Sequence, residues 1–148
     1  MEAPQKCPEC GASWTRDQTC ESSFHQMLFW EAEYPVYGEV HHLMVLCYYL
    51  QHPSLYSPAG LHEARRLLAE FVERGTAPFE VRQRNRDRVD SGKRDWKITG
   101  TPTSQGSYQQ PQQWVLTAVD VVAGGSENYC DNVRTWARLI NEALRALP

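Results

Sequence analysis

The stretch Cys20–Pro53, CESSFHQMLFWEAEYPVYGEVHHLMVLCYYLQHP, predicts two helices joined by a short turn. In its first part, Phe24 and Leu28 fall on one stripe of a helix. Pro35 and Gly38 end that helix, and Pro53 ends the second one. The second helix has apolar residues at helical spacing, namely Val40, Leu43, Met44, Cys47 and Leu50. Because the connection is short, we expect the two helices to pack antiparallel.

The remaining sequence completes the prediction of a mainly α fold. The pair Ser57-Pro58 predicts the start of a third helix, which Gly75 ends. The β-branched run Trp114–Val122 predicts a strand or an extended segment, with which Trp96–Thr99 could pair. We expect a single domain, a small helical bundle with a short β or extended segment before the last helix. Because Cys7-Pro-Glu-Cys10-Gly is a Cys-x-x-Cys motif, we also expect an N-terminal zinc knuckle. The expected parts of the domain are a metal-binding knuckle at 1–19, three helices at 20–75, an irregular or β segment at 76–125 and a C-terminal helix at 126–148.

Length and composition restrict the class of protein. A chain of 148 residues that is 41% hydrophobic can bury the core of one ordinary domain. No run approaches the ~18–20 apolar residues of a membrane span, and the first residues lack the apolar segment of a signal peptide. We therefore expect a cytoplasmic protein. The net charge of -3 predicts no general attraction to polyanions.

The segment Cys7-Pro-Glu-Cys10-Gly, upstream of the predicted hairpin, is typical of a zinc knuckle. Two thiolates on one tight turn can hold a tetrahedral ion at ~2.3 Å. Five cysteines are an odd number, so they cannot all form internal disulfides. No apolar strand precedes the motif, which argues against a thioredoxin-like redox site. Cys20 is a natural third ligand, and either zinc or iron suits such thiolates.

The fourth ligand follows from the geometry of the hairpin. Each helix has roughly fourteen residues, so it is about 20 Å long. Cys20, at the start of the first helix, then lies beside the end of the second, which carries His52. His41 lies at the other end of the second helix, about 16 Å from His52. The predicted set is therefore Cys7, Cys10, Cys20 and His52. His25 is the alternative fourth ligand. In the alternative without a metal, Cys20 is an ordinary core residue and His52 caps the end of its helix.

At these residues the chain resembles a family of uncharacterised bacterial proteins grouped as DUF5946. The matching features are the Cys7–Gly11 knuckle, Cys20, and the run His41–Pro53, HHLMVLCYYLQHP. The family pattern is His-x-Leu-Thr-Val-x-x-Tyr-x-x-Gln-His-Pro, and Met44 stands where Thr is usual. A weaker likeness extends through Trp114, Asp120-Val121 and Trp136-Ala137. The resemblance supports the grouping of these residues and implies no particular activity.

Two further groups of residues could carry chemistry. His41, His42, Glu31 and Glu33 could form a polar cluster at the turn end of the hairpin, suited to acid–base chemistry or a second metal. The stronger interpretation is a His–Glu hydrogen bond that joins two helices. The basic run Arg82–Arg94 could contact a nucleic-acid backbone, but interleaved aspartates dilute its field, so a solvated loop is favoured.

These patterns favour a small zinc-binding protein in which Zn²⁺ is structural, because four protein ligands leave no open position for substrate or water. They lean away from an enzyme. One alternative is a metal-dependent enzyme of the helical-bundle type, with a second, open site near His41 or His42. Another is a nucleic-acid-associated zinc module that uses the Arg82–Arg94 segment.

Overall fold

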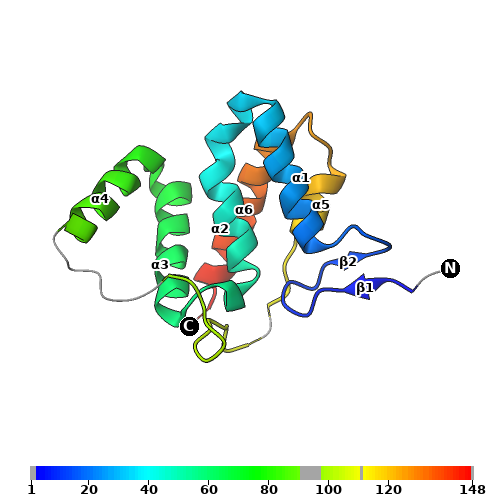
Figure 1. Cartoon of the computed structure of the whole chain (residues 1–148), viewed down its shortest axis with the longest axis horizontal. Helices are drawn as coiled ribbons and strands as arrows, with labels where there is room; N and C mark the ends of the chain where they lie inside the picture. The colour runs from blue at the N-terminus through cyan, green and yellow to red at the C-terminus, as the bar shows by residue number, and fades with distance from the viewer. Residues whose placement is uncertain (1–2, 91–97, 111, 148) are drawn as a thin grey trace.

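The computed structural model describes residues 3–90, 98–110 and 112–147, and within this part the fold is mainly α-helical (Figure 1). The elements in chain order are β1 (Gln5–Lys6), β2 (Ser13–Trp14), α1 (Cys20–Glu33), α2 (His41–Leu50), α3 (Pro58–Ala69), α4 (Pro78–Asp90), α5 (Ala118–Ala123) and α6 (Tyr129–Arg145). Short 3-10 segments at Pro35–Val40 and Pro53–Leu55 precede and follow α2. None of the helices described is long and apolar enough to cross a membrane.

A small antiparallel hairpin forms the N-terminal end of the structure. Its strands β1 and β2 pair Gln5 with Trp14 and Lys6 with Ser13. The connection between the strands contains both cysteines of the knuckle. After the hairpin, the Thr19 side chain accepts a 3.0 Å hydrogen bond from the Ser22 amide and caps α1. The hairpin therefore leads directly into the helix that starts at Cys20.

Helices α1 and α2 run antiparallel, as predicted from the short connection (Figure 1). The centroids of the Phe24 and Tyr48 rings lie 4.5 Å apart, and this contact joins the two helices near the β1–β2 hairpin. The turn is a 3-10 segment that begins at Pro35, whose fixed φ suits a first helical position. The start of α1 and the end of α2 consequently lie at the same end of the molecule.

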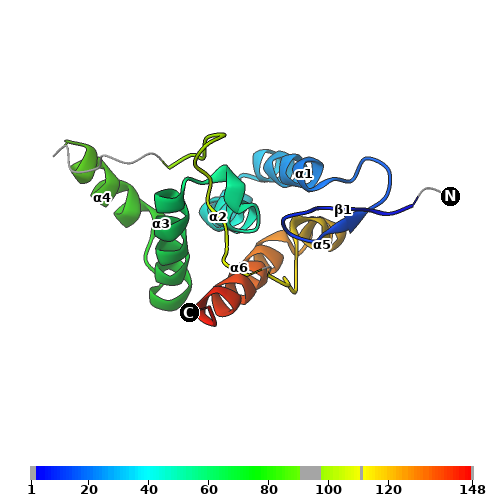
Figure 2. The ribbon, with the colours of Figure 1, turned by 90° about the horizontal axis from the view of Figure 1, so that it is seen from below.

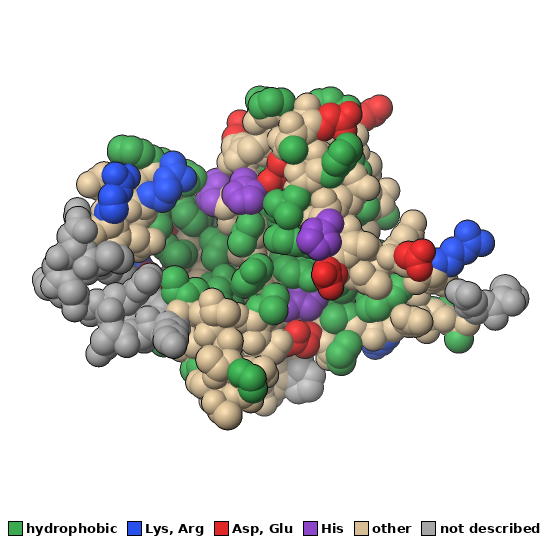
Figure 3. All heavy atoms as spheres, viewed as in Figure 1, with side chains coloured by type: hydrophobic (Ala, Val, Ile, Leu, Met, Phe, Trp, Pro, Cys, Tyr) green, Lys and Arg blue, Asp and Glu red, His purple; other side chains and the backbone are tan. Residues whose placement is uncertain are grey.

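Helix α6 supplies the centre of the core. It packs against α2, α3 and α5, and α5 also packs on α1 (Figure 2). Its inward side chains include Trp136, which is fully buried, and the same face carries Val133, Ala137, Ile140 and Leu144. On the face seen in Figure 3, hydrophobic side chains gather between α1 and α4. The large fully buried side chains include Met27, Met44, Leu50, Leu68, Tyr129 and Ile140.

The segment before the last helix differs in detail from a strand. Trp114–Thr117 has no regular structure, and the next residues form α5. The Asp120 carboxylate accepts hydrogen bonds from both the amide and the hydroxyl of Thr117, at 2.9 and 3.1 Å. This capping arrangement outweighs the β propensity of the valines and starts a helix. Thr99 forms an isolated bridge with Tyr56 instead, and Trp96 lies outside the described residues.

The basic segment after α3 also differs from expectation. Helix α3 is capped by Ser57 and continues into a π-helical turn at Glu70–Arg74, which Gly75 ends with a φ of 67°. The expected solvated loop was wrong over its first part, because Pro78–Asp90 is helix α4. The several Arg residues of this run are good helix formers, although they supply no apolar stripe. Lys93 and Arg94 lie outside the described residues.

Candidate metal centre

The turn of the N-terminal hairpin positions the first two sulfur atoms. The Cys7 amide donates to Ala12 O at 2.8 Å and the Gly11 amide donates to Cys7 O at 3.0 Å, which closes a tight turn. Gly11 has a φ of 78°, which a residue with a side chain rarely adopts. Amides also face the sulfurs, since the Cys10 amide donates to Cys7 Sγ at 3.5 Å and the Ala12 amide to Cys10 Sγ at 3.4 Å. These donors stabilise negative sulfur.

The other two members of the group come from the α1–α2 hairpin. Cys20 is the first residue of α1, where the positive end of the helix dipole favours a thiolate. His52 follows α2 and is 6% exposed. Cys10 Sγ and Cys20 Sγ are 3.4 Å apart. All ligand atoms of Cys7, Cys10, Cys20 and His52 lie within 4.8 Å of one another, and all four residues are buried. This group could hold a metal ion.

The ring of His52 is fixed in one orientation. Its Nδ1 lies 2.6 Å from Tyr48 O, and because a carbonyl oxygen can only accept, Nδ1 carries the proton that it donates. The Tyr48 ring lies beside the imidazole, with centroids 4.4 Å apart. Nε2 is buried and makes no hydrogen bond of normal geometry, although the Cys10 sulfur lies close enough to interact with the ring electrostatically. A backbone-anchored Nδ1 with a free Nε2 is the arrangement that metal-binding histidines use.

The sulfurs are electrostatically unbalanced without a cation. The hydrogen bond with Cys20, aided by His52 and opposed by burial, lowers the pKa of Cys10 to about 4. The same hydrogen bond, together with burial, raises the pKa of Cys20 far above its usual value. The thiolate form of Cys10 is therefore stabilised, and ionisation of Cys20 beside it is unfavourable. A bound divalent cation would offset the repulsion and allow all three sulfurs to be negative.

A further contact ties the knuckle to the segment after His52. The Glu9 carboxylate accepts a 3.1 Å hydrogen bond from the Ser54 amide. Sequence reasoning missed this role of Glu9, since the contact joins residues far apart in the chain. It also missed Tyr48, whose carbonyl orients His52, although the four-residue spacing of a helix could have indicated it.

His25, the competing fourth ligand, is not part of the group. Its side chain is 64% exposed and lies 3.6 Å from Glu21, one helical turn earlier. An exposed His–Glu contact of this kind contributes little to stability. Position in the fold, rather than closeness in sequence to Cys20, therefore decides between the two histidines.

The polar cluster at the turn end of the hairpin is only partly formed. His41 Nδ1 lies 2.6 Å from Glu31 Oε1, and the buried Tyr129 hydroxyl donates to the other carboxylate oxygen of Glu31. His42 packs edge-on against the Phe71 ring at 4.6 Å, and Glu33 is exposed. Within the described ranges, the Cys7–Cys10–Cys20–His52 group is the only set of three or more His, Cys, Asp or Glu side chains placed to hold a metal ion. The Glu31 cluster joins α1, α2 and α6.

The other cysteines and the basic residues of α4 lie away from the Cys7–Cys10–Cys20–His52 group. All five cysteines are free, with Cys47 fully buried in the core and Cys130 half-buried on α6. Burial raises the pKa of the Cys47 thiol well above its usual value, so it is protonated and unreactive. On α4, Arg84 pairs with Glu70 at 2.9 Å, while Arg82 and Arg86 are exposed. Part of the basic run therefore serves an ion pair within the fold.

Comparison with known proteins identifies the family. A family model described as "Family of unknown function (DUF5946)" matches residues 5–145, so the chain belongs to this family. The matched range includes every residue of the Cys7–Cys10–Cys20–His52 group. The comparisons with curated proteins and with solved structures found no match. Function must therefore be argued from the site.

Proposed function

We propose that this member of the DUF5946 family is a zinc-binding protein whose Cys7, Cys10, Cys20 and His52 hold one structural Zn²⁺. The observation that carries the proposal is the unpartnered Nε2 of His52, buried among three sulfurs while Nδ1 is anchored to Tyr48 O. A buried nitrogen without a partner is costly, and a metal bond would satisfy it. Three thiolates and one imidazole are a common ligand set of structural zinc.

The origin of the ligands supports a structural role. Two come from the N-terminal hairpin, one from the start of α1 and one from the end of α2. An ion bonded to all four would join three segments that otherwise share few contacts at this end of the fold. Zinc supplies strong, nearly tetrahedral bonds to sulfur and nitrogen. Four protein ligands would fill its coordination sphere, which leaves no position for a substrate.

The composition of the ligand set favours zinc over iron. Iron–sulfur clusters are mostly held by four cysteines, and mononuclear non-haem iron commonly by two histidines and a carboxylate. Three cysteines with one histidine is a frequent zinc set. The five free thiols suit a reducing compartment, and we place the protein in the cytoplasm on that ground. Reconstitution of chelator-treated protein with Zn²⁺ or Fe²⁺ in separate samples distinguishes the two metals.

The structural role is tested by thermal unfolding of the purified protein before and after treatment with a strong chelator. Zinc present at a thousandfold excess over its dissociation constant stabilises the folded state by about 4 kcal/mol. For a chain of this size, we expect the melting temperature to fall by about 10 °C on chelation. Added Zn²⁺ should restore it and added Mg²⁺ should not. An identical melting temperature with and without chelator would contradict the structural role.

A further inference from the structure

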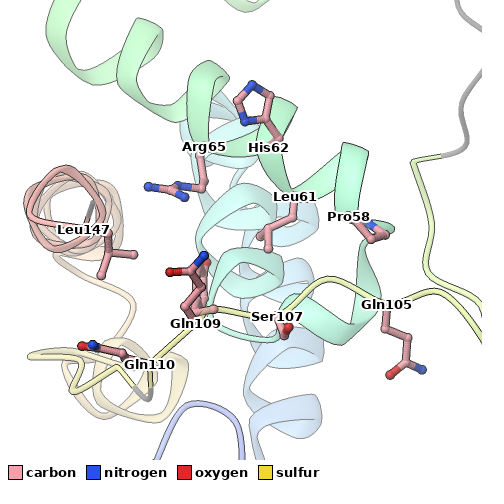
Figure 4. Close-up of a pocket in the computed structure, with 10 residues that line it drawn as sticks. Pro58, Leu61, His62, Arg65, Gln105, Ser107, Gln109, Gln110 and Leu147 are labelled. Carbon is pink, nitrogen blue, oxygen red and sulfur yellow. The ribbon is translucent and has the colours of Figure 1, made fainter.

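A hollow lies away from the cysteines, between α3, the loop of residues 105–110 and the end of α6 (Figure 4). Its volume is about 310 Å³. This is at the small end of the ~300–1,000 Å³ range of ligand pockets, so it suits a molecule of modest size. The lining comes from three parts of the chain that are distant in sequence, which is typical of a binding site that only the folded state assembles.

The loop that walls this hollow is held in place by the backbone, although it has no regular structure. The Gly106 amide donates to Tyr56 O at 2.8 Å, and the Tyr108 hydroxyl donates to Leu50 O at 2.5 Å. A side chain at Gly106 would place its Cβ 2.9 Å from Pro53 O, so glycine permits this close approach. The wall is therefore formed before any ligand arrives, which lowers the ordering cost of binding.

Within the part of the chain that the structure describes, the hollow carries a positive charge that no carboxylate neutralises. Arg65 extends from α3 and is half-buried, and its Nη2 donates to Leu144 O at the end of α6, at 3.1 Å. This is its one hydrogen bond within the described residues, and no ion pair to it occurs there. The next residue, Arg66, differs in that it pairs with Glu63 and Glu70. Among the described residues, no acidic side chain lines the hollow. The free guanidinium N–H groups of Arg65 are therefore available to an anion.

The rest of the lining combines the imidazole of His62 on α3 with neutral hydrogen-bonding groups and an apolar part. The amides of Gln105, Gln109 and Gln110 and the hydroxyl of Ser107 come from the loop. Leu61 from α3 and Leu147 beyond α6 supply aliphatic surface. Such a lining can bind a charged head group and a short hydrocarbon body at the same time.

We propose that this hollow is a binding site for a small organic carboxylate with a short apolar chain, in which Arg65 binds the carboxylate. Arg65 is the one guanidinium in the lining, with the His62 imidazole and neutral amides around it, and this matches one negative charge better than the double charge of a phosphate monoester. Leu61 and Leu147 bury the chain, and the loop amides bind the remaining carboxylate lone pairs. This site is independent of the proposed metal ligation, since none of the four metal-site residues lines it.

The test uses hexanoate as the probe and hexanamide, its uncharged analogue, as the control ligand, with ¹H–¹⁵N NMR on the metal-loaded protein. We expect hexanoate to saturate with a dissociation constant on the order of 1 mM, as befits so small a ligand. The amide signals of residues 105–109 should shift most. Hexanamide should bind at least fivefold more weakly, because it lacks the charge that Arg65 recognises. This comparison requires no mutation.

Substitutions at adjacent arginines sharpen the test. Arg65→Gln removes the charge and should weaken hexanoate binding at least fivefold, while Arg65→Lys should retain part of it. Arg66→Gln removes a charge on the same helix that lies outside the hollow, and should leave the dissociation constant within twofold. Equal binding of hexanoate and hexanamide, unchanged binding to Arg65→Gln, or shifts confined to other parts of the chain would overturn the proposal. So would the absence of any shift at 20 mM hexanoate.

Discussion

Cys20 and His52 stand at opposite ends of the α1–α2 hairpin sequence, yet their ligand atoms lie within 4.8 Å of each other. The antiparallel packing of the two helices produces this closeness, because it returns the end of α2 to the start of α1. The hairpin of β1 and β2 adds Cys7 and Cys10 to the same spot. The proposed metal ion would thus hold together the ends of three elements.

The first prediction concerns Cys10, which lies in contact with the Cys20 sulfur. Cys10→Ser should abolish tight zinc binding, since an alcohol is a far poorer ligand than a thiolate. The free energy of unfolding should fall by about 3–4 kcal/mol, the contribution of a ligand present at a few hundred to a thousand times its dissociation constant. Urea unfolding with excess Zn²⁺ present measures the difference.

The matched control for this substitution is Cys130→Ser. Cys130 is half-buried on α6 and does not belong to the metal group. Its replacement should change the free energy of unfolding by less than about 1 kcal/mol and should leave zinc content unchanged. Equal losses of stability in the two variants would show that Cys10 acts as an ordinary core thiol.

The second prediction concerns the carboxylate that joins three helices. Tyr129→Phe removes the hydroxyl that donates to Glu31 and leaves that carboxylate, whose side chain is 7% exposed, with His41 as its partner. We expect a loss of about 1.5–3 kcal/mol, the range for a hydrogen bond to a charged group. Tyr34→Phe, at a 42% exposed side chain, is the control and should change stability by less than ~0.5 kcal/mol.

A double-mutant cycle isolates the Tyr129–Glu31 interaction. If the hydroxyl and the carboxylate act together, Tyr129→Phe should cost clearly less in a Glu31→Gln background than in the wild type. Burial and the neighbouring Glu31 raise the pKa of Tyr129, so the hydroxyl is protonated and able to donate at any ordinary pH. Additive losses in the cycle would mean that the effect of Tyr129→Phe comes from packing alone.

The metal group was within reach of sequence reasoning because its geometry depends on few facts. Cys7 and Cys10 are linked by a short turn, and the two proline-bounded helices have equal predicted lengths, which places Cys20 beside His52. The contact partners of these residues were not predictable in the same way. The Glu9–Ser54 hydrogen bond and the two partners of Glu31 join positions whose approach depends on the complete packing.

The errors in the fold have a common cause. The sequence of α5 contains three valines with high β propensity. Thr117 and Asp120 lie at its start at capping-box spacing, and their local hydrogen bonds outweigh that propensity. Helix α4 carries arginines where a buried stripe would be expected, so periodicity gave no signal. In both segments, the helix is specified by residues at its start and by intrinsic propensity. Hydrophobic patterning alone does not find such helices.

The third prediction concerns glycines that allow backbones to touch. A Cβ at Gly60 would lie 2.3 Å from Ile98 O, the carbonyl that accepts a hydrogen bond from the Ser57 amide. Gly60→Ala should therefore displace this backbone and cost about 1–3 kcal/mol. Gly38→Ala is the control, because no atom lies within 4 Å of its Cβ position. A thermal melt of each variant that showed equal midpoints would refute the close approach.

The fourth prediction concerns pH and His42. Burial, with His41 and Arg82 nearby, lowers the pKa of His42 to about 4 in the folded protein, whereas the unfolded chain has the ordinary value near 6.5. Between these values the unfolded state binds more protons, so stability is complete above about pH 6.5 and is lost as the pH falls toward 4. Because the ring is partly exposed, we expect the loss from this residue to be about 1–2 kcal/mol.

The contribution of His42 is obtained from the difference between the wild type and His42→Gln. Release of the proposed metal ion and carboxylate titration would weaken both proteins equally at low pH, so these effects cancel in the comparison. Urea unfolding at several pH values from 7.5 to 4.5 should show a wild-type stability that declines more steeply than that of the variant. Parallel curves would mean that His42 titrates normally in the folded state.

The most direct test of the proposed metal site is the ratio of zinc to protein, determined by elemental mass spectrometry on the wild type, His52→Ala and His25→Ala after dialysis against a weak chelator. We expect about one zinc per chain in the wild type and in His25→Ala, and much less than one in His52→Ala, because only His52 directs a free nitrogen at the three sulfurs. A wild type without zinc, or a His52→Ala variant that keeps the full amount, would contradict the four-residue site.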